Sequence, residues 1–167
     1  MAVHHYTKRI PGFLLLRLSM SRWLSSKIIR PHLLRLAGIK LGKNAHVGAN
    51  VTFDTIAPTL FEIGDNVTIT MNCVLLMHFL KPLENGRLTW HRGKMKIGNN
   101  VFIGANSVIA KPVTIGSNVV IAAGSVVTKD IPADVVAVGN PCRVLRPIGE
   151  HDREFFYKEE KIDWENL

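Results

Sequence analysis

The sequence predicts an all-β fold, a parallel β-helix, from two features of residues 97–127. An aliphatic residue returns at every sixth position, and each time it is Ile or Val: Ile97, Ile103, Ile109, Ile115, Ile121 and Val127. The residue after each of them is Gly, Ala or Thr. A six-residue period fits neither the turn of an α-helix nor the two-residue alternation of a plain strand, whereas it is typical of short strands wound into a triangular coil.

Each six-residue unit forms one side of the triangle, so three units make a coil of 18 residues. Coils pair with their neighbours as strands do in a parallel sheet, and the aliphatic side chains point inward and stack from coil to coil. The predicted stacked pairs are Ile97 with Ile115, Ile103 with Ile121, and Ile109 with Val127. One coil cannot bury its own apolar face, so the fold depends on stacking several coils.

The same register continues upstream with two interruptions. Its aliphatic or aromatic positions are Leu41, Val47, Phe53, Ile63, Ile69 and Leu75. The first interruption adds four residues near 57–60, and the second adds 16 residues, which we place in a loop at about 78–94. A long excursion from a regular repeat is usually functional or disordered, so the second interruption is the first place to look for a site.

Charge and composition divide the chain of 167 residues into three segments: a basic helical leader at 1–38, the β-helix at 39–146, and a C-terminal extension at 147–167. Residues 1–53 hold nine Lys or Arg and no Asp or Glu, whereas residues 150–167 hold seven acidic and three basic residues. Two cysteines, Cys73 and Cys142, suit a reducing cytosol rather than a disulfide scaffold. We therefore expect a cytoplasmic protein.

The leader mixes leucines with arginines over residues 12–37 and predicts one or two amphipathic helices, broken at Pro31. Basic amphipathic helices bind anionic membrane surfaces, which would place the protein on the inner face of the cell membrane. A second interpretation is a helical cap that covers the open end of the coil and its unpaired edge, with its arginines solvated. Nucleic-acid binding is not expected, because no recognition motif is present.

Four segments carry more specific motifs: Asp-Asn-Val at 65–67, the stretches 97–109 and 122–132, and Val-Gly-Asn-Pro-Cys-Arg-Val-Leu-Arg at 138–146. Together they resemble the hexapeptide-repeat acyltransferases, and within them the sugar and polysaccharide O-acetyltransferases, which include galactoside and maltose acetyltransferases. The resemblance covers about 40–167. It implies a left-handed β-helix, a homotrimer with acetyl-CoA in the groove between subunits, and transfer of an acetyl group to a saccharide hydroxyl.

The leader at 1–38 departs from the helical N-terminal segment of the maltose enzymes and is more like the basic leader of polysaccharide-tailoring members. The expected acceptor is therefore a polysaccharide or a lipid-linked sugar precursor. A small free sugar and a hydroxyl-bearing antibiotic are the alternatives. Serine acetyltransferase is disfavoured, because its large N-terminal helical domain has no counterpart here.

The resemblance places the catalytic histidine at His78, where the regular coil ends and the insertion begins. A sugar hydroxyl is a poor nucleophile, and a neutral imidazole can take its proton as it attacks the thioester. His91, in the same insertion, is the competing base. Asp54 and Glu84 are candidates to orient His78, and the sequence does not choose between them.

The resemblance also assigns cofactor and substrate contacts. The cofactor positions are Ala105, Ala123, Thr128, Lys129, Arg143 and Arg146. Ala105 matches a coil position that contacts the pantetheine arm, and Ala123 matches a second groove position. Thr128 and Lys129 match the pair near the nucleotide end. The cationic side chains of Lys129, Arg143 and Arg146 suit phosphate oxygens. Asn50 and Asn72 are candidate acceptor contacts or orienters of His78, although asparagine also suits the corners of a β-helix.

Two other classes share the predicted fold. The γ-class carbonic anhydrases need three histidines around zinc, but only His78 and His91 fall in the right region, with His46 about two coils away. We therefore expect no metal. A β-helix that serves only as a scaffold is the other class, and it would release no thiol from acetyl-CoA with any hydroxyl acceptor.

Overall fold

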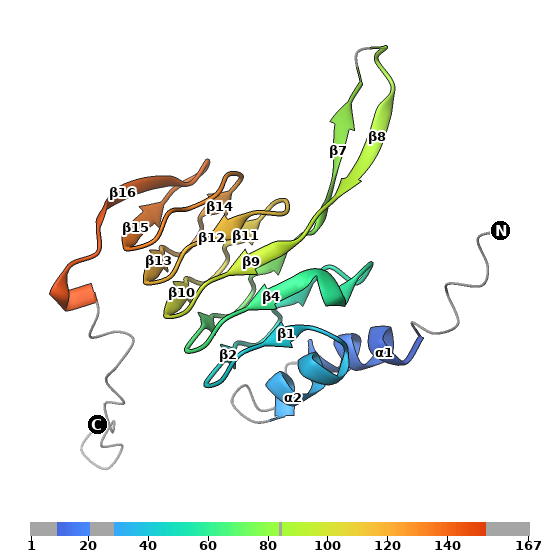
Figure 1. Cartoon of the computed structure of the whole chain (residues 1–167), viewed down its shortest axis with the longest axis horizontal. Helices are drawn as coiled ribbons and strands as arrows, with labels where there is room; N and C mark the ends of the chain where they lie inside the picture. Colours follow the sequence, from blue (N-terminus) through green and yellow to red (C-terminus); the bar gives the residue numbers. More distant parts are fainter. Residues whose placement is uncertain (1–9, 21–28, 84, 153–167) are drawn as a thin grey trace.

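The computed structural model describes residues 10–20, 29–83 and 85–152. Parallel strands wind into a triangular coil, with two helices at one end and a long hairpin projecting from its side (Figure 1). The parts of the predicted leader and of the C-terminal extension at 1–9, 21–28 and 153–167 lie outside the described residues.

The β-helix has three faces, and each face is a sheet of parallel strands that come from successive coils of the chain. The first face contains β1 (Lys40–Leu41), β4 (Phe61–Ile63), β9 (Met95–Ile97) and β12 (Thr114–Ile115). The second contains β2 (His46–Val47), β5 (Thr68–Ile69), β10 (Val101–Ile103), β13 (Val119–Ile121), β15 (Val135–Val138) and the antiparallel β16 (Arg143–Pro147). The third contains β3 (Thr52–Phe53), β6 (Val74–Leu75), β11 (Val108–Ile109) and β14 (Val126–Val127).

The register of these strands confirms the stacked pairs predicted from the six-residue repeat. The paired positions are Ile97 with Ile115, Ile103 with Ile121, and Ile109 with Val127. Upstream, Leu41 pairs with Ile63, Val47 with Ile69, and Phe53 with Leu75. The side chains at most of these positions are buried, and they form the continuous core of the coil.

Asparagines make many of the corners. Seven of them adopt a positive φ between 52° and 60°: Asn44, Asn50, Asn66, Asn72, Asn100, Asn106 and Asn118. Their amides hydrogen-bond from coil to coil, for example from Asn100 Nδ2 to Asn118 Oδ1 at 2.9 Å. Asparagine tolerates this backbone region better than most residues with a side chain. At Gly104 the corner is too tight for a side chain, since a Cβ atom would overlap the backbone nitrogen of Ala123.

Both interruptions of the repeat take regular forms. The four extra residues contain a short 3₁₀ helix, η1 (Pro58–Leu60). The longer insertion, predicted as a loop, is an antiparallel hairpin of β7 (His78–Pro82) and β8 (Leu88–Arg92), which projects from the coil (Figure 1). At its base the Gly93 N–H donates to the Met77 carbonyl at 3.1 Å, so the chain re-enters the coil beside the point where it left.

The leader forms a helical cap from α1 (Ile10–Ser19) and α2 (Ile29–Leu36) beside the first coil (Figure 1). Leu16 and Leu34 are fully buried against the core of the coil. The predicted break at Pro31 is wrong: α2 begins at Ile29, and Pro31 lies in its first turn, where a missing N–H costs no helical hydrogen bond. Neither described helix is long and apolar enough to cross a bilayer.

Candidate active site

His78 and Asp54 meet at the corner between the third and first faces of the coil. Asp54 follows β3 and His78 opens β7, and the two segments are aligned because Phe53 pairs with Leu75. The Asp54 N–H donates to the Leu75 carbonyl at 2.9 Å. This alignment brings the imidazole Nδ1 of His78 into hydrogen-bonding contact with the Asp54 carboxylate.

The carboxylate of Asp54 is buried and held by the backbone on both oxygens. Its side chain is 3% exposed, whereas that of His78 is 27% exposed. Asp54 Oδ2 accepts the Met77 N–H at 3.0 Å, and Oδ1 accepts the Ile56 N–H at 3.1 Å. A carboxylate at Nδ1 fixes the ring and favours the tautomer with its proton on Nδ1, so Nε2 is the nitrogen that can accept a proton.

The two faces of the hairpin carry different aromatic contacts. On the face of His78, the Trp90 ring lies 5.0 Å from the imidazole between ring centroids, at 54°. On the opposite face, His91 stacks on Phe79 at 5.7 Å. His91 is therefore turned away from the Asp54–His78 pair. Glu84, the other predicted orienter, lies outside the described residues.

The predicted cofactor positions on the coil fall along the two edges of the third face. Ala105 and Ala123 lie at its corner with the second face, where the Gly124 N–H donates to the Ala105 carbonyl at 2.8 Å. Thr128 and Lys129 follow β14, at the corner that also carries His78. The coil therefore brings two of the four to the edge of the candidate base and places the other two across the face.

Arg143 and Arg146 lie on β16, at the end of the coil away from the cap (Figure 1). Arg143 Nη1 donates to the Cys142 carbonyl at 2.9 Å. Arg146 forms two hydrogen bonds with Asp152, which lower the pKa of that carboxyl to about 2 and raise the pKa of Arg146. A phosphate at Arg146 would therefore compete with a carboxylate already in place.

Asn50 and Asn72 lie at the corner between the second and third faces, a different corner from that of His78. Both adopt a positive φ, and Asn50 Nδ2 donates to Asn72 Oδ1 at 3.2 Å. They thus belong to the asparagine ladder of the coil. The spacing of asparagines along the repeat is the sequence signal for this role, and contact with an acceptor stays a prediction.

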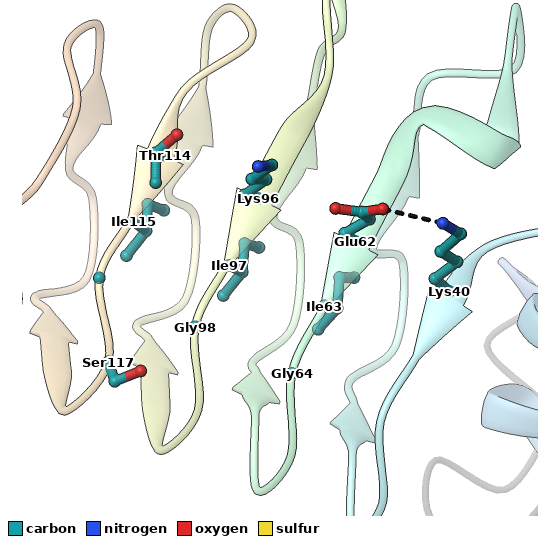
Figure 2. A pocket seen from close by; sticks show the side chains of 11 residues that line it. Lys40, Glu62, Ile63, Gly64, Lys96, Ile97, Gly98, Thr114, Ile115 and Ser117 are labelled. Carbon is teal, nitrogen blue, oxygen red and sulfur yellow. Dashed lines mark hydrogen bonds and ion pairs between the residues drawn. The ribbon is translucent and has the colours of Figure 1, made fainter.

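The first face carries a second polar feature, a shallow hollow lined by Lys40, Glu62, Lys96 and Thr114 (Figure 2). Lys40 and Lys94 both pair with the Glu62 carboxylate, at 2.9 Å and 2.5 Å, and these contacts lower the pKa of Glu62 to about 2. The residues that line the hollow include no group suited to accept a proton from a hydroxyl at neutral pH. The hollow is therefore a surface patch of paired charges on the outside of the coil.

No metal-binding arrangement occurs in the described ranges: no three or more His, Cys, Asp or Glu side chains gather as ligands there. His46 lies on β2, in the second face. The expectation that no metal is required stays a prediction.

Two family models match the chain. The model described as bacterial transferase hexapeptide (six repeats) matches residues 94–129, and the hexapeptide repeat of succinyl-transferase matches residues 36–54. Among curated proteins, the galactoside O-acetyltransferase of Escherichia coli K12 is 42% identical over an alignment of 132 residues, and the match covers 73% of this chain. The matched region spans 63% of the length of that relative.

Two solved structures agree with these matches. A maltose O-acetyltransferase from Clostridium difficile 630 superposes with a TM-score of 0.66 at 32% identity, covering 85% of this chain and 87% of that one. A galactoside acetyltransferase in complex with coenzyme A gives a TM-score of 0.65 at 31% identity, covering 95% of this chain and 90% of that one. These likenesses confirm the predicted fold class, a left-handed β-helix.

Proposed function

Because the chain belongs to the hexapeptide-repeat acyltransferases, in the group of sugar O-acetyltransferases, we propose that it moves an acetyl group from acetyl-CoA directly to a saccharide hydroxyl. The observation that carries the proposal is the Asp54–His78 contact at the base of the hairpin. It supplies an oriented imidazole at an exposed edge of the coil, which is what activation of a hydroxyl requires.

In the proposed reaction the acceptor hydroxyl gives its proton to Nε2 of His78 while its oxygen forms a bond to the thioester carbonyl carbon. The resulting oxyanion is stabilised by a backbone N–H in the groove. The imidazolium, paired with Asp54, then returns the proton to the departing thiolate as the carbon–sulfur bond breaks. No acetyl-enzyme forms at any point.

The acetyl-CoA site that we propose follows the third face of the coil. Ala105 and Ala123 border it on one edge, and Thr128 and Lys129 border it on the edge of His78. Arg143 and Arg146 would meet phosphates at the end of the groove. The matched galactoside acetyltransferase structure is a complex with coenzyme A, which supports this co-substrate.

We propose that the active protein is a homotrimer with this groove between neighbouring subunits. A cyclic trimer repeats one interface and so generates three equal grooves. The third face and its corners form one wall of the proposed groove, and a second subunit would supply the other wall. A fully active monomer in sedimentation velocity would contradict this arrangement.

The acceptor that we propose is a polysaccharide or a lipid-linked sugar precursor at the inner face of the cell membrane. The cap supports this location, because its outward residues Leu14, Leu18 and Leu36 are 57%, 49% and 65% exposed in a segment without acidic residues. Such a surface suits anionic lipid. A small free sugar remains the alternative, favoured by the names of the matched galactoside and maltose enzymes.

Thiol release from acetyl-CoA tests the proposal directly. Methyl β-galactopyranoside, maltose and a polyprenyl-diphosphate-linked oligosaccharide are offered in turn, and we expect release with at least one of them. Replacing His78 by Ala should lower kcat by roughly 10²–10⁴-fold with little change in acetyl-CoA affinity. His91→Ala is the matched control on the other face of the hairpin. The proposal would be contradicted if no saccharide gave thiol release. It would also be contradicted if His91→Ala lost this much kcat while His78→Ala kept the wild-type value.

A further inference from the structure

Trp90 is a large aromatic residue left open beside the candidate base. Its ring lies 5.0 Å from that of His78, and yet the residue is 66% exposed. Burial of a tryptophan is normally favourable, so this indole contributes little to the fold of the single chain. Its open surface lies on the same face of the hairpin as the imidazole.

The position of Trp90 follows from the register of the hairpin. Trp90 on β8 pairs with Leu80 on β7, and side chains two residues apart on a strand share a face. Leu80 and His78 are therefore on one face, and Trp90 reaches His78 along the diagonal. The neighbouring positions Phe79 and His91 occupy the opposite face.

The geometry of the base limits where an acceptor can lie. Because the Asp54 carboxylate holds Nδ1 of His78, the reacting hydroxyl must approach Nε2, at roughly 3 Å. The sugar carbon that carries this hydroxyl is one bond further, so the ring of the sugar lies within a few ångströms of the imidazole. The Trp90 indole occupies that neighbourhood on one side.

We propose that Trp90 is the platform on which a pyranose ring of the acceptor packs while one of its hydroxyls is presented to His78. The inference rests on the proposed function and adds a binding residue to it. A pyranose has an apolar face of C–H groups and a polar rim. An indole offers an extended apolar face whose π-electrons attract the positive edge of C–H bonds, and contact between the two removes both from water.

The test compares acceptors that do and do not contain a sugar ring. Trp90→Ala is assayed with the best of the three saccharides named above and with glycerol, whose hydroxyls have no ring behind them. We expect kcat/KM for the saccharide to fall about 10–100-fold, mainly through KM. The rate with glycerol and the KM for acetyl-CoA should stay within about twofold of wild type. Trp90→Phe should retain most of the saccharide activity, because it keeps an aromatic face.

Leu88→Ala is the matched control, since Leu88 is 63% exposed and lies two residues before Trp90 on the same strand. If Trp90→Ala lost the same factor in kcat/KM with glycerol and with the saccharide, Trp90 would position His78 rather than bind the sugar ring, and the proposal would be wrong. An unchanged saccharide KM in Trp90→Ala, a loss in Leu88→Ala as large as in Trp90→Ala, or a loss that follows dissociation of the assembly in sedimentation would also overturn it. A wild-type protein inactive with every saccharide would instead contradict the proposed function.

Discussion

Asp54 has two roles at the corner of the coil, and both depend on its burial. It accepts the backbone N–H groups of Met77 and Ile56, which fix the chain where the hairpin leaves the coil. It also holds Nδ1 of His78. Removal of a buried, hydrogen-bonded carboxylate leaves donors without partners, so the two roles can be separated only by a substitution that keeps an acceptor oxygen.

Asp54→Asn is that substitution. The amide oxygen can still accept a backbone N–H, but the substitution removes the negative charge that stabilises the imidazolium. The amide can also donate to Nδ1, which favours the tautomer of His78 with its proton on Nε2. We expect kcat to fall by about 10²-fold or more, while the KM for acetyl-CoA changes little. Steady-state kinetics and thermal unfolding check this result together.

Asp65→Asn provides the control for Asp54→Asn. Asp65 also accepts a backbone N–H at a corner, from Lys43 at 2.6 Å, but it lies at another corner of the coil. The Asp65→Asn substitution should therefore leave kcat close to the wild-type value. Equal effects of the two substitutions on kcat would show that Asp54 acts through the fold rather than through His78.

At the scale of elements, the contacts within the repeat could be predicted from the sequence, whereas the contacts made by the insertion could not. The stacked pairs could be predicted because inward positions recur every six residues, and one shift would turn them all outward. The same register aligns Phe53 with Leu75 and so places Asp54 near His78, a signal available in the sequence. The contact of Trp90 with His78 could not be predicted, because it depends on the pairing of β7 with β8, and most of their side chains are exposed rather than held by a core.

The cap shows the same contrast. Its helices follow from the leucine pattern, whereas the charge pattern places Arg30 among solvated arginines and the structure buries it. Arg30 donates to the Ser19 carbonyl at 2.7 Å and to the Val47 carbonyl at 2.5 Å, and so joins α1, α2 and the second face. Only the docking of the two helices on the coil defines this position.

Arg30→Ala should therefore destabilise the protein strongly. Two carbonyls would lose a charged donor, and we expect the free energy of unfolding to fall by about 2–4 kcal/mol. The control is Arg35→Ala. The exposed guanidinium of Arg35 donates to the Leu41 carbonyl at 2.9 Å and to the Gly42 carbonyl, and its loss should cost less than about 1 kcal/mol because it lies in solvent. Urea unfolding at fixed protein concentration measures both. Similar losses would contradict the assigned role of Arg30.

For the whole molecule, the arrangement of the cap and the hairpin bears on the acceptor. His78 follows the second coil, counted from the cap, and four coils stack in all before β15. The candidate site therefore lies nearer the capped end of the coil than its far end (Figure 1). A protein held at a membrane by its cap would present this site close to the lipid surface.

Vesicle binding tests the membrane role that we propose for the cap. Deletion of residues 1–38 would remove Leu16 and Leu34 and expose the core residues that they cover, so substitution of outward residues is the better probe. We expect co-sedimentation with anionic vesicles that weakens with added salt, because each base near the surface contributes about 1 kcal/mol. Leu36→Gln should reduce binding, whereas Leu145→Gln on β16, which is similarly exposed, should not. If binding is the same with neutral and anionic lipid, and neither substitution changes it, the cap has only a structural role.

Direct transfer through a complex of acetyl-CoA, acceptor and His78 is the central claim, and initial-velocity kinetics test it most directly. Both substrates are varied, with thiol release as the signal. Because no acetyl-enzyme is proposed, both substrates must be bound before the thiol leaves, and the double-reciprocal lines should intersect. Parallel lines, or a burst of thiol equal to the enzyme concentration when the saccharide is omitted, would reveal an acetyl-enzyme and contradict the account.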